Sequence, residues 1–176
     1  MNITESKLQG CLIIEPKVFH DDRGFFLETY QASRYSKLIG ISKSFVQDNH
    51  SKSIKGVLRG LHFQKKKPQG KLVRVVTGEV FDVVVDIRPK SDTYGKWESF
   101  ILNEEIKNQL WIPPGFAHGF MTLSKFADLE YKCTDYYDPS DEGTIIWNDP
   151  LLGIDWPINK PIVSKKDAQG LLFSEL

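Results

Sequence analysis

The sequence predicts an all-β protein, a sandwich or barrel of short strands, and three observations support this prediction. Segments rich in β-branched and aromatic residues recur at close, regular spacing along the chain. Glycine and proline punctuate them, as turns between strands require. Helical periodicity is nearly absent, and there are no repeats or low-complexity segments. Short strands spaced in this way are typical of sandwiches and barrels.

Taken in chain order, each apolar or β-branched segment predicts one strand. The predicted strands are Cys11–Ile14 (ended by Pro16), Phe25–Tyr30, Phe45–His50, Leu58–Gln64, Leu72–Val76, Val80–Ile87, Glu98–Leu102, Gln109–Ile112, Gly119–Leu123, Leu129–Tyr136 and Thr144–Trp147. Between them we expect a polar turn at His20–Gly24, a short helix at Ala32–Leu38 ended by Gly40, and a loop at Ser51–Lys55. Thr77-Gly78 predicts a hairpin between its two neighbouring strands. The proline-broken C-terminal segment is expected to wrap around the outside.

Length, charge and cysteine content narrow the class of protein. The 176 residues suit a single domain over 1–176 with one well-buried core. Lys plus Arg and Asp plus Glu both number 23, which argues against nucleic-acid or membrane partners bound by bulk charge. Cys11 and Cys133 lie far apart and match no metal-binding spacing, so a reducing, cytoplasmic compartment is expected. The N-terminus has no secretory signal pattern, and no apolar run is long enough to span a membrane.

The stretch VLRGLHFQ holds the first candidate for chemistry, His62. Strand alternation predicts that Leu58, Gly60, His62 and Gln64 share one face of the Leu58–Gln64 strand and that Arg59, Leu61 and Phe63 share the other. A glycine beside the histidine leaves space around its imidazole.

Two motifs resemble those of the cupin jelly rolls. Gly56, His62 and Gln64 follow the spacing of the first motif, and Pro113-Pro114-Gly115-Phe116-Ala117-His118 follows the second, P-x-G-x-x-H. Metal-binding cupins use three histidines and a glutamate, but Gln64 and Lys71 occupy two of those four positions here. An ammonium group repels a divalent cation, so we expect a cupin-type double-stranded β-helix (a jelly-roll barrel) with short peripheral helices, no metal and no cofactor. A metal cupin remains the alternative, which elemental analysis would test.

Without a metal, Lys71 takes over its electrostatic role. Removing the α-proton of a carbonyl compound gives an enolate, and a fixed positive charge near the oxygen stabilises it. His62 is the candidate base at neutral pH, and Lys71 is the counter-charge.

A succession of motifs then resembles one family from about Gly10 to Leu172. The motifs are HDDRGFFLETY, FVQDNHS, GVLRGLHFQ, PQGKLVRVVTGEVFDVVVDIR, WIPPGFAHGF, LEYKCTDYYDP and DPLLGIDWP, and the family is the dTDP-4-dehydrorhamnose 3,5-epimerases. The resemblance implies a homodimeric, cofactor-independent isomerase. Its reaction would invert C3 and C5 of dTDP-4-dehydro-6-deoxy-D-glucose to give dTDP-4-dehydro-L-rhamnose, on the route to dTDP-L-rhamnose.

The same resemblance implies roles for individual residues. His62 matches the catalytic base, Tyr131 the proton donor and Asp167 the carboxylate that orients the base. The implied nucleotide-sugar contacts are Arg23, Glu28, Gln47, Asp48, Asn49, Arg59, Lys71, His118, Glu142 and Lys166, with Tyr137 stacking on thymine. The doubled Lys165-Lys166 leaves open which lysine makes the last contact.

Several of these residues also have a structural interpretation. His118 could cap a turn, Tyr131 could belong to the core, Tyr137 could be a rim aromatic, and Arg23 could pair with Asp21 or Asp22. Lys65–Lys67 reads as a solvated loop, and His20 and His50 as surface residues. Three other functions remain open, namely a C3-only epimerase, an epimerase of another nucleotide sugar, and a non-catalytic cupin that binds a nucleotide sugar.

Overall fold

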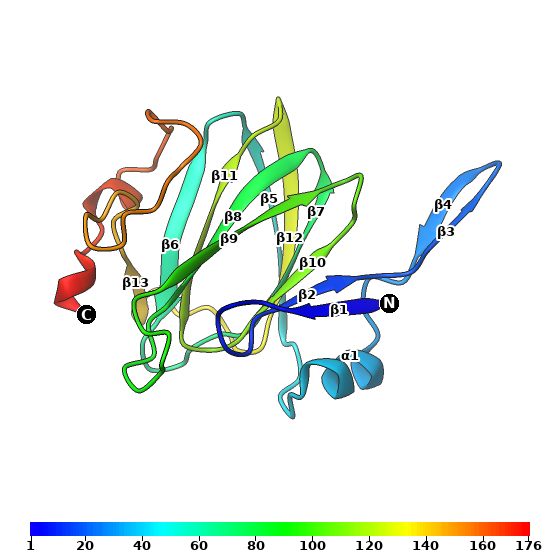
Figure 1. Cartoon of the computed structure of the whole chain (residues 1–176), viewed down its shortest axis with the longest axis horizontal. Helices are drawn as coiled ribbons and strands as arrows, with labels where there is room; N and C mark the ends of the chain where they lie inside the picture. Colours follow the sequence, from blue (N-terminus) through cyan, green and yellow to red (C-terminus); the bar gives the residue numbers. More distant parts are fainter.

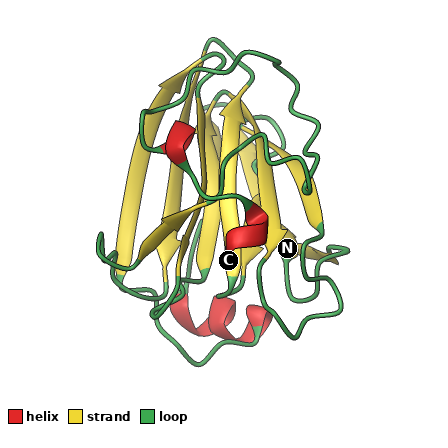
Figure 2. Ribbon diagram, turned by 90° about the vertical axis from the view of Figure 1, so that its left-hand side faces the viewer, coloured by secondary structure: helices red, strands yellow, loops and turns green.

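Two antiparallel sheets face each other and enclose a barrel in the computed structural model, which describes residues 1–176 (Figures 1 and 2). The six-stranded sheet has the order β1 (Asn2–Glu5), β2 (Leu12–Glu15), β10 (Gln109–Ile112), β7 (Lys71–Thr77), β12 (Phe126–Cys133) and β5 (Gln47–Ile54). The five-stranded sheet has the order β13 (Glu142–Thr144), β6 (Leu58–Gln64), β11 (Phe116–Thr122), β8 (Glu79–Asp86) and β9 (Trp97–Asn103). The chain changes sheet at most connections, which makes the barrel a jelly roll and confirms the predicted fold class.

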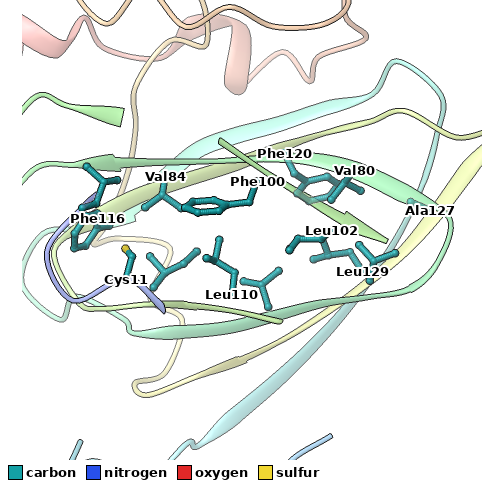
Figure 3. Packing of buried hydrophobic residues seen from close by; sticks show 14 residues of the cluster. Cys11, Val80, Val84, Phe100, Leu102, Leu110, Phe116, Phe120, Ala127 and Leu129 are labelled. Atoms are coloured by element: carbon teal, nitrogen blue, oxygen red, sulfur yellow. The ribbon is translucent and has the colours of Figure 1, made fainter. Parts of the chain in front are cut away.

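Apolar side chains at alternate positions fill one part of the space between the sheets. Val73 and Val75 point inward from β7, and Val80 and Val84 point inward from β8. They pack with residues of β9, β10, β11 and β12 in a cluster of 14 buried residues (Figure 3). This cluster leaves the remainder of the barrel interior to polar side chains.

Two smaller apolar clusters cover the outer faces of the sheets. Helix α1 (Ala32–Ile39) begins at Gln31, whose side chain accepts a hydrogen bond from the Arg34 N–H, and ends at Gly40 with φ of 67°. Its Tyr35 packs with Trp111 outside the six-stranded sheet. The C-terminal segment covers the five-stranded sheet through Trp156 and continues into the 3-10 helices η1 (Asp167–Gln169) and η2 (Phe173–Glu175). The helix prediction and the expected wrapping of the C-terminal segment are confirmed.

A two-stranded hairpin projects away from the barrel (Figure 1). It consists of β3 (Val18–Asp21) and β4 (Gly24–Leu27), which pair only with each other. Phe19, Phe25 and Phe26 are 51%, 56% and 70% exposed on it. An isolated hairpin is only marginally stable in water, and exposed aromatic side chains are typical of surfaces that bind another molecule.

The predicted Thr77-Gly78 hairpin is wrong. Strand β7 pairs with β10 and β12, whereas β8 pairs with β11 and β9, so Gly78 lies where the chain crosses from one sheet to the other. A Cβ atom on Gly78 would lie 2.2 Å from the Phe126 carbonyl oxygen. The glycine is needed for this close passage between two strands and not for a two-residue turn.

The predicted alternation along β6 is also wrong. On β11, His118 pairs with His62 but Phe120 pairs with Arg59, so β6 carries one extra residue between its two partners. The extra residue lies at Gly60, which has φ of 133°. As a result Leu58 packs outward with the cluster under the C-terminal segment, while Arg59 and His62 both face the interior.

Several other boundaries differ from the predictions. Strand β5 continues through Ser51–Ile54, which was expected to be a loop, because this polar segment pairs with β12 along its whole length. Strands β11, β12 and β13 begin two or three residues before their predicted starts, and β1 and β3 were not predicted. The Leu58–Gln64 and Gln109–Ile112 strands are confirmed with their predicted bounds. No helix in the chain is both long enough and apolar enough to cross a membrane.

Candidate active site

Polar side chains line a cavity of about 340 Å³ inside the barrel, a size common among ligand sites. They come from both sheets and from the loops at one rim. The lining residues are Gln47, Asn49, Ser51, Arg59, His62, Gln69, Lys71, His118, Gly119, Phe120, Tyr131, Tyr137 and Glu142.

The buried carboxylate of Asp167 is hydrogen-bonded to the His62 ring on the side away from the cavity. The His62 Nε2 atom lies 2.7 Å from Oδ1 of Asp167, which is 4% exposed, and the Gly60 N–H donates to Oδ2 of the same carboxylate at 3.3 Å. Burial raises the pKa of Asp167, but its hydrogen bonds with His62 and the Gly60 N–H outweigh that effect and lower the pKa overall. The aspartate is therefore ionised at neutral pH and fixes the imidazole, whose Nδ1 atom has no protein partner and remains accessible from the cavity.

Lys71 begins β7 and points into the same cavity. The residue is 9% exposed, and its Nζ atom makes no hydrogen bond or ion pair within the chain. Burial lowers the pKa of Lys71, while the charges of Asp82 and Glu142 oppose that shift. The Lys71 side chain thus presents N–H donors that no protein group uses to whatever occupies the cavity.

Tyr131 faces the cavity from β12 in the opposite sheet. Its ring centroid lies 6.0 Å from the Lys71 Nζ atom, and its hydroxyl has no protein partner. Burial raises the pKa of Tyr131 to about 12, so the phenol keeps its proton at neutral pH. A base on one sheet and a proton donor on the other can act on two faces of one bound ring.

Three charged and polar groups meet at the rim. Glu142 accepts hydrogen bonds from the Tyr137 hydroxyl at 2.7 Å and from the Lys166 ammonium group. Burial raises the pKa of Glu142, but these two hydrogen bonds outweigh it and lower the pKa overall. Because Lys166 precedes Asp167, this contact also ties the segment that carries Asp167 to β13.

The remaining predicted contacts in the cavity are held by local hydrogen bonds. Gln47 donates to the Asn49 side chain at 3.0 Å and accepts from the Tyr137 N–H at 2.9 Å. Arg59 donates from Nε to the Ser53 hydroxyl at 2.9 Å. His118 lies beside His62 as its partner on β11.

The structure does not bring Asp48, Arg23 or Glu28 to this cavity. Asp48 faces outward on β5 and pairs with Lys132. Arg23 lies on the projecting hairpin with a side chain 90% exposed and pairs with Asp21, which was one of the two structural interpretations of this residue. Glu28 pairs with Arg34.

Four lining residues and one buried partner were not predicted. Gln69, Ser51, Gly119 and Phe120 line the cavity, and Asp82 lies behind His118. Gln69 stands two residues before Lys71 in the quoted motif and could have been found there. Asp82 carried no signal, because one acidic residue within a β-branched strand has no recognisable spacing.

The geometry supports proton transfer at carbon next to a carbonyl group. Within one cavity it offers a histidine hydrogen-bonded to a carboxylate, a phenol on the facing sheet and a buried lysine. No group of three or more His, Cys, Asp or Glu side chains is arranged to hold a metal ion.

Comparisons with known proteins point to one family. The family described as dTDP-4-dehydrorhamnose 3,5-epimerase matches residues 5–175. The dTDP-4-dehydrorhamnose 3,5-epimerase of Salmonella typhimurium is 55% identical over 99% of this chain and 97% of its own length. A dTDP-4-dehydrorhamnose 3-epimerase of Streptomyces niveus is 39% identical over 99% of this chain and 85% of its own length.

Solved structures agree with this result. The 3,5-epimerase of Legionella pneumophila, solved in complex with dTDP-4-keto-L-rhamnose, superposes with a TM-score of 0.96 and 55% identity, covering 98% of this chain and 93% of its own. The Mycobacterium tuberculosis epimerase gives a TM-score of 0.95 at 38% identity, covering 99% of this chain and 90% of its own.

Proposed function

Because the chain belongs to the dTDP-4-dehydrorhamnose 3,5-epimerase family, we propose that its cavity inverts C3 and C5 of dTDP-4-dehydro-6-deoxy-D-glucose, giving dTDP-4-dehydro-L-rhamnose. The chain is an isomerase of the dTDP-L-rhamnose route. The observation that carries the residue assignment is the convergence of His62, Tyr131 and Lys71 on one cavity, each with a polar atom free of protein partners. Since the family match spans residues 5–175, we treat the chain as one domain.

The first step is removal of the proton next to the C4 ketone. Nδ1 of His62 takes the proton, the C–H bonding pair becomes the C=C bond of the enolate, and the carbonyl pair moves onto O4. Asp167 stabilises the imidazolium that forms. Lys71 donates to O4 as its charge grows, which lowers the barrier most when the donor is already fixed in a buried site.

The second step delivers a proton to the opposite face of the same carbon. The Tyr131 hydroxyl gives up its proton, the enolate pair forms the new C–H bond, and the ketone is restored. Solvent then takes the proton from His62 and returns one to the Tyr131 phenolate, so that both groups are ready for the second carbon. Nothing is oxidised or reduced in this cycle.

Residues of the cavity and its rim are suited to hold the nucleotide. Arg59 offers a guanidinium to the diphosphate, and Tyr137 offers an exposed ring to the thymine. Gln47, Asn49, His118, Glu142 and Lys166 supply the remaining polar contacts of the proposed site.

Proton NMR in deuterated water tests this function with dTDP-4-dehydro-6-deoxy-D-glucose as substrate. Deuterium is expected at both C3 and C5. Deuterium at C3 alone would make the chain a C3-epimerase, an alternative kept open by its 39% identity to a 3-epimerase. Binding without any exchange would indicate a binding protein or a different nucleotide sugar.

We further propose a homodimer in which the β3–β4 hairpin of one copy reaches the cavity of the other. The proposal reconciles two facts. Arg23 and Glu28 match substrate contacts of the family, yet they lie on or next to an element that projects away from the chain's own cavity (Figure 1). The exposed aromatic rings of the hairpin supply the apolar surface that such docking would bury.

Mixing two inactive variants distinguishes action across the dimer from action within one chain. If Arg23 serves the partner's site, a heterodimer of Arg23→Ala and His62→Ala contains one intact site and recovers activity. If Arg23 acts within its own chain, no intact site forms and activity stays absent. Phe26→Ser should weaken the dimer in light scattering, whereas Leu151→Ser should not, although both residues are 70% exposed.

We also propose that the protein works in the cytoplasm. Its two cysteines, Cys11 and Cys133, are buried and unpaired, which suits a reducing compartment.

A further inference from the structure

A fully buried carboxylate lies in the barrel interior outside the His62–Asp167 pair. Asp82 is 0% exposed and lies on the same face of β8 as Val80 and Val84, which belong to the apolar core. Its side chain makes hydrogen bonds only to His118, whose Nε2 atom lies 3.0 Å from Oδ1 and 2.9 Å from Oδ2. Burying a carboxylate without a positive partner costs several kcal/mol, so a positive charge on His118 would stabilise Asp82.

The opposite side of the same imidazole faces the cavity. His118 is 6% exposed and lines the cavity, and its Nδ1 atom has no protein partner but is accessible. The carboxylate accepts the Nε2–H, so the protonation state decides what Nδ1 offers. A neutral ring offers a lone pair there, and an imidazolium offers an N–H donor.

The surroundings of His118 favour a different state from that of His62. The two residues are direct partners across β6 and β11, at a spacing where like charges disfavour each other. Asp167 divides its hydrogen bonds among His62 and the Gly60 N–H, whereas Asp82 gives both oxygens to His118 alone.

The other charged and titratable groups around this pair do not reverse that preference. From the facing strands and the rim these are Arg59 on β6, Lys71 on β7, Tyr131 and Cys133 on β12, and Glu142 on β13. The charges of Lys71 and Arg59 disfavour a further cation, and Glu142 offsets one of them. None of these groups is hydrogen-bonded to the His118 ring, whereas Asp82 is.

We propose that Asp82 is a positioning residue that holds His118 as an imidazolium, whose Nδ1–H joins Lys71 in donating to the substrate oxygen that becomes the enolate. This inference rests on the proposed function, because it assigns a second donor to the same intermediate. Two donors on one oxygen are effective because both are fixed before the charge develops. The two neighbouring histidines then have different roles: His62 accepts the proton, and His118 stabilises the negative charge on the enolate oxygen.

The protonation state of His118 can be measured directly in the wild-type protein. The chain has four histidines, so selective ¹⁵N labelling of imidazole gives a simple spectrum, with His118→Gln providing the assignment. At pH 7.5 both ring nitrogens of His118 are expected to carry protons, while those of His62 show one proton. A singly protonated His118 in the wild-type protein would overturn the inference.

Kinetics then test the link to Asp82. In Asp82→Asn, His118 is expected to lose its second proton at pH 7.5, kcat to fall by about 10²-fold, the loss typical of one oxyanion donor, and KM to change little. Asp82→Asn/His118→Gln should be no slower than His118→Gln alone. Asp86→Asn makes the same chemical change at another 0%-exposed aspartate of β8, outside the cavity, and should leave the pH–rate profile unchanged.

The outcomes separate this inference from the proposed function. A singly protonated His118 together with normal deuterium incorporation at C3 and C5 overturns the inference alone. Absence of deuterium incorporation overturns the proposed function and the enolate role with it. An Asp82→Asn profile that changes no more than that of Asp86→Asn reduces Asp82 to a structural residue and refutes the proposal.

Discussion

Replacing Tyr131 with phenylalanine should separate proton removal from inversion. The hydroxyl has no protein partner, so its loss leaves no buried group unsatisfied, and the free energy of unfolding should change by less than about 0.5 kcal/mol. With a pKa of about 12, Tyr131 is almost entirely protonated at pH 7.5, so nearly every molecule can donate a proton. Losing a positioned acid should slow product formation by about 10²–10⁴-fold, equivalent to about 3–5 kcal/mol.

The assay follows two rates in deuterated water. His62 still removes the α-proton of the substrate in Tyr131→Phe and returns a deuteron to the face from which the proton left. Deuterium should therefore enter the substrate without inversion, faster than the inverted sugar forms. Tyr136→Phe is the matched control, because this tyrosine is 65% exposed and does not line the cavity, and it should behave as wild type. Inversion at the wild-type rate in Tyr131→Phe would refute Tyr131 as the donor.

Three further changes test other parts of the site and fold. Lys71→Met should lower both deuterium exchange and inversion by about 10²–10³-fold, because both pass through the enolate; an effect on KM alone would contradict this. Asp167→Asn should lower kcat by about 10²–10⁴-fold with KM little changed, and a wild-type rate would remove it from the mechanism. Hydrogen bonds from Arg88, Ser91 and Thr93 outweigh burial and lower the pKa of Asp86 from 3.8 to about 2, so this carboxylate stabilises the fold above pH 4 and loses that effect as pH falls through 2. Asp86→Asn should thus lose about 2 kcal/mol of unfolding free energy at pH 7, and urea titrations should show the difference shrinking towards pH 2.

The sequence predicted the cavity well where a motif fixed the residue and poorly where position depended on the rest of the fold. His62, Lys71 and Tyr131 come from three strands in two sheets, and the structure brings them together as the motifs implied. The motifs could not show that Arg23 and Glu28 lie on or beside a projecting hairpin, because location relative to the barrel is a property of tertiary structure. Asp82 was missed for the same reason, since only the pairing of β8 with β11 places it behind His118.

Strand existence was easier to predict than strand partners. Glycine beside a β-branched run indicates a reversal of the chain, but it does not distinguish a tight hairpin from a crossing between sheets. At Gly78 the deciding contact is with the Phe126 carbonyl, nearly fifty residues later in the sequence. Local propensity contains no information about such a contact, so the hairpin prediction failed there.

The single extra residue in β6 explains why the active site can form at all. In a regular strand Arg59 and His62 would face opposite sides, and the diphosphate contact would lie outside the barrel while the base lay inside. The irregularity depends on close passage of Gly60 and Gly119, since a Cβ on Gly60 would lie 2.5 Å from the Gly119 Cα atom. The same irregularity directs the Gly60 N–H to Asp167, whose carboxylate supports His62. A local break in strand regularity therefore aligns the base, its carboxylate and the proposed phosphate contact at once, and it leaves His118 directly beside His62.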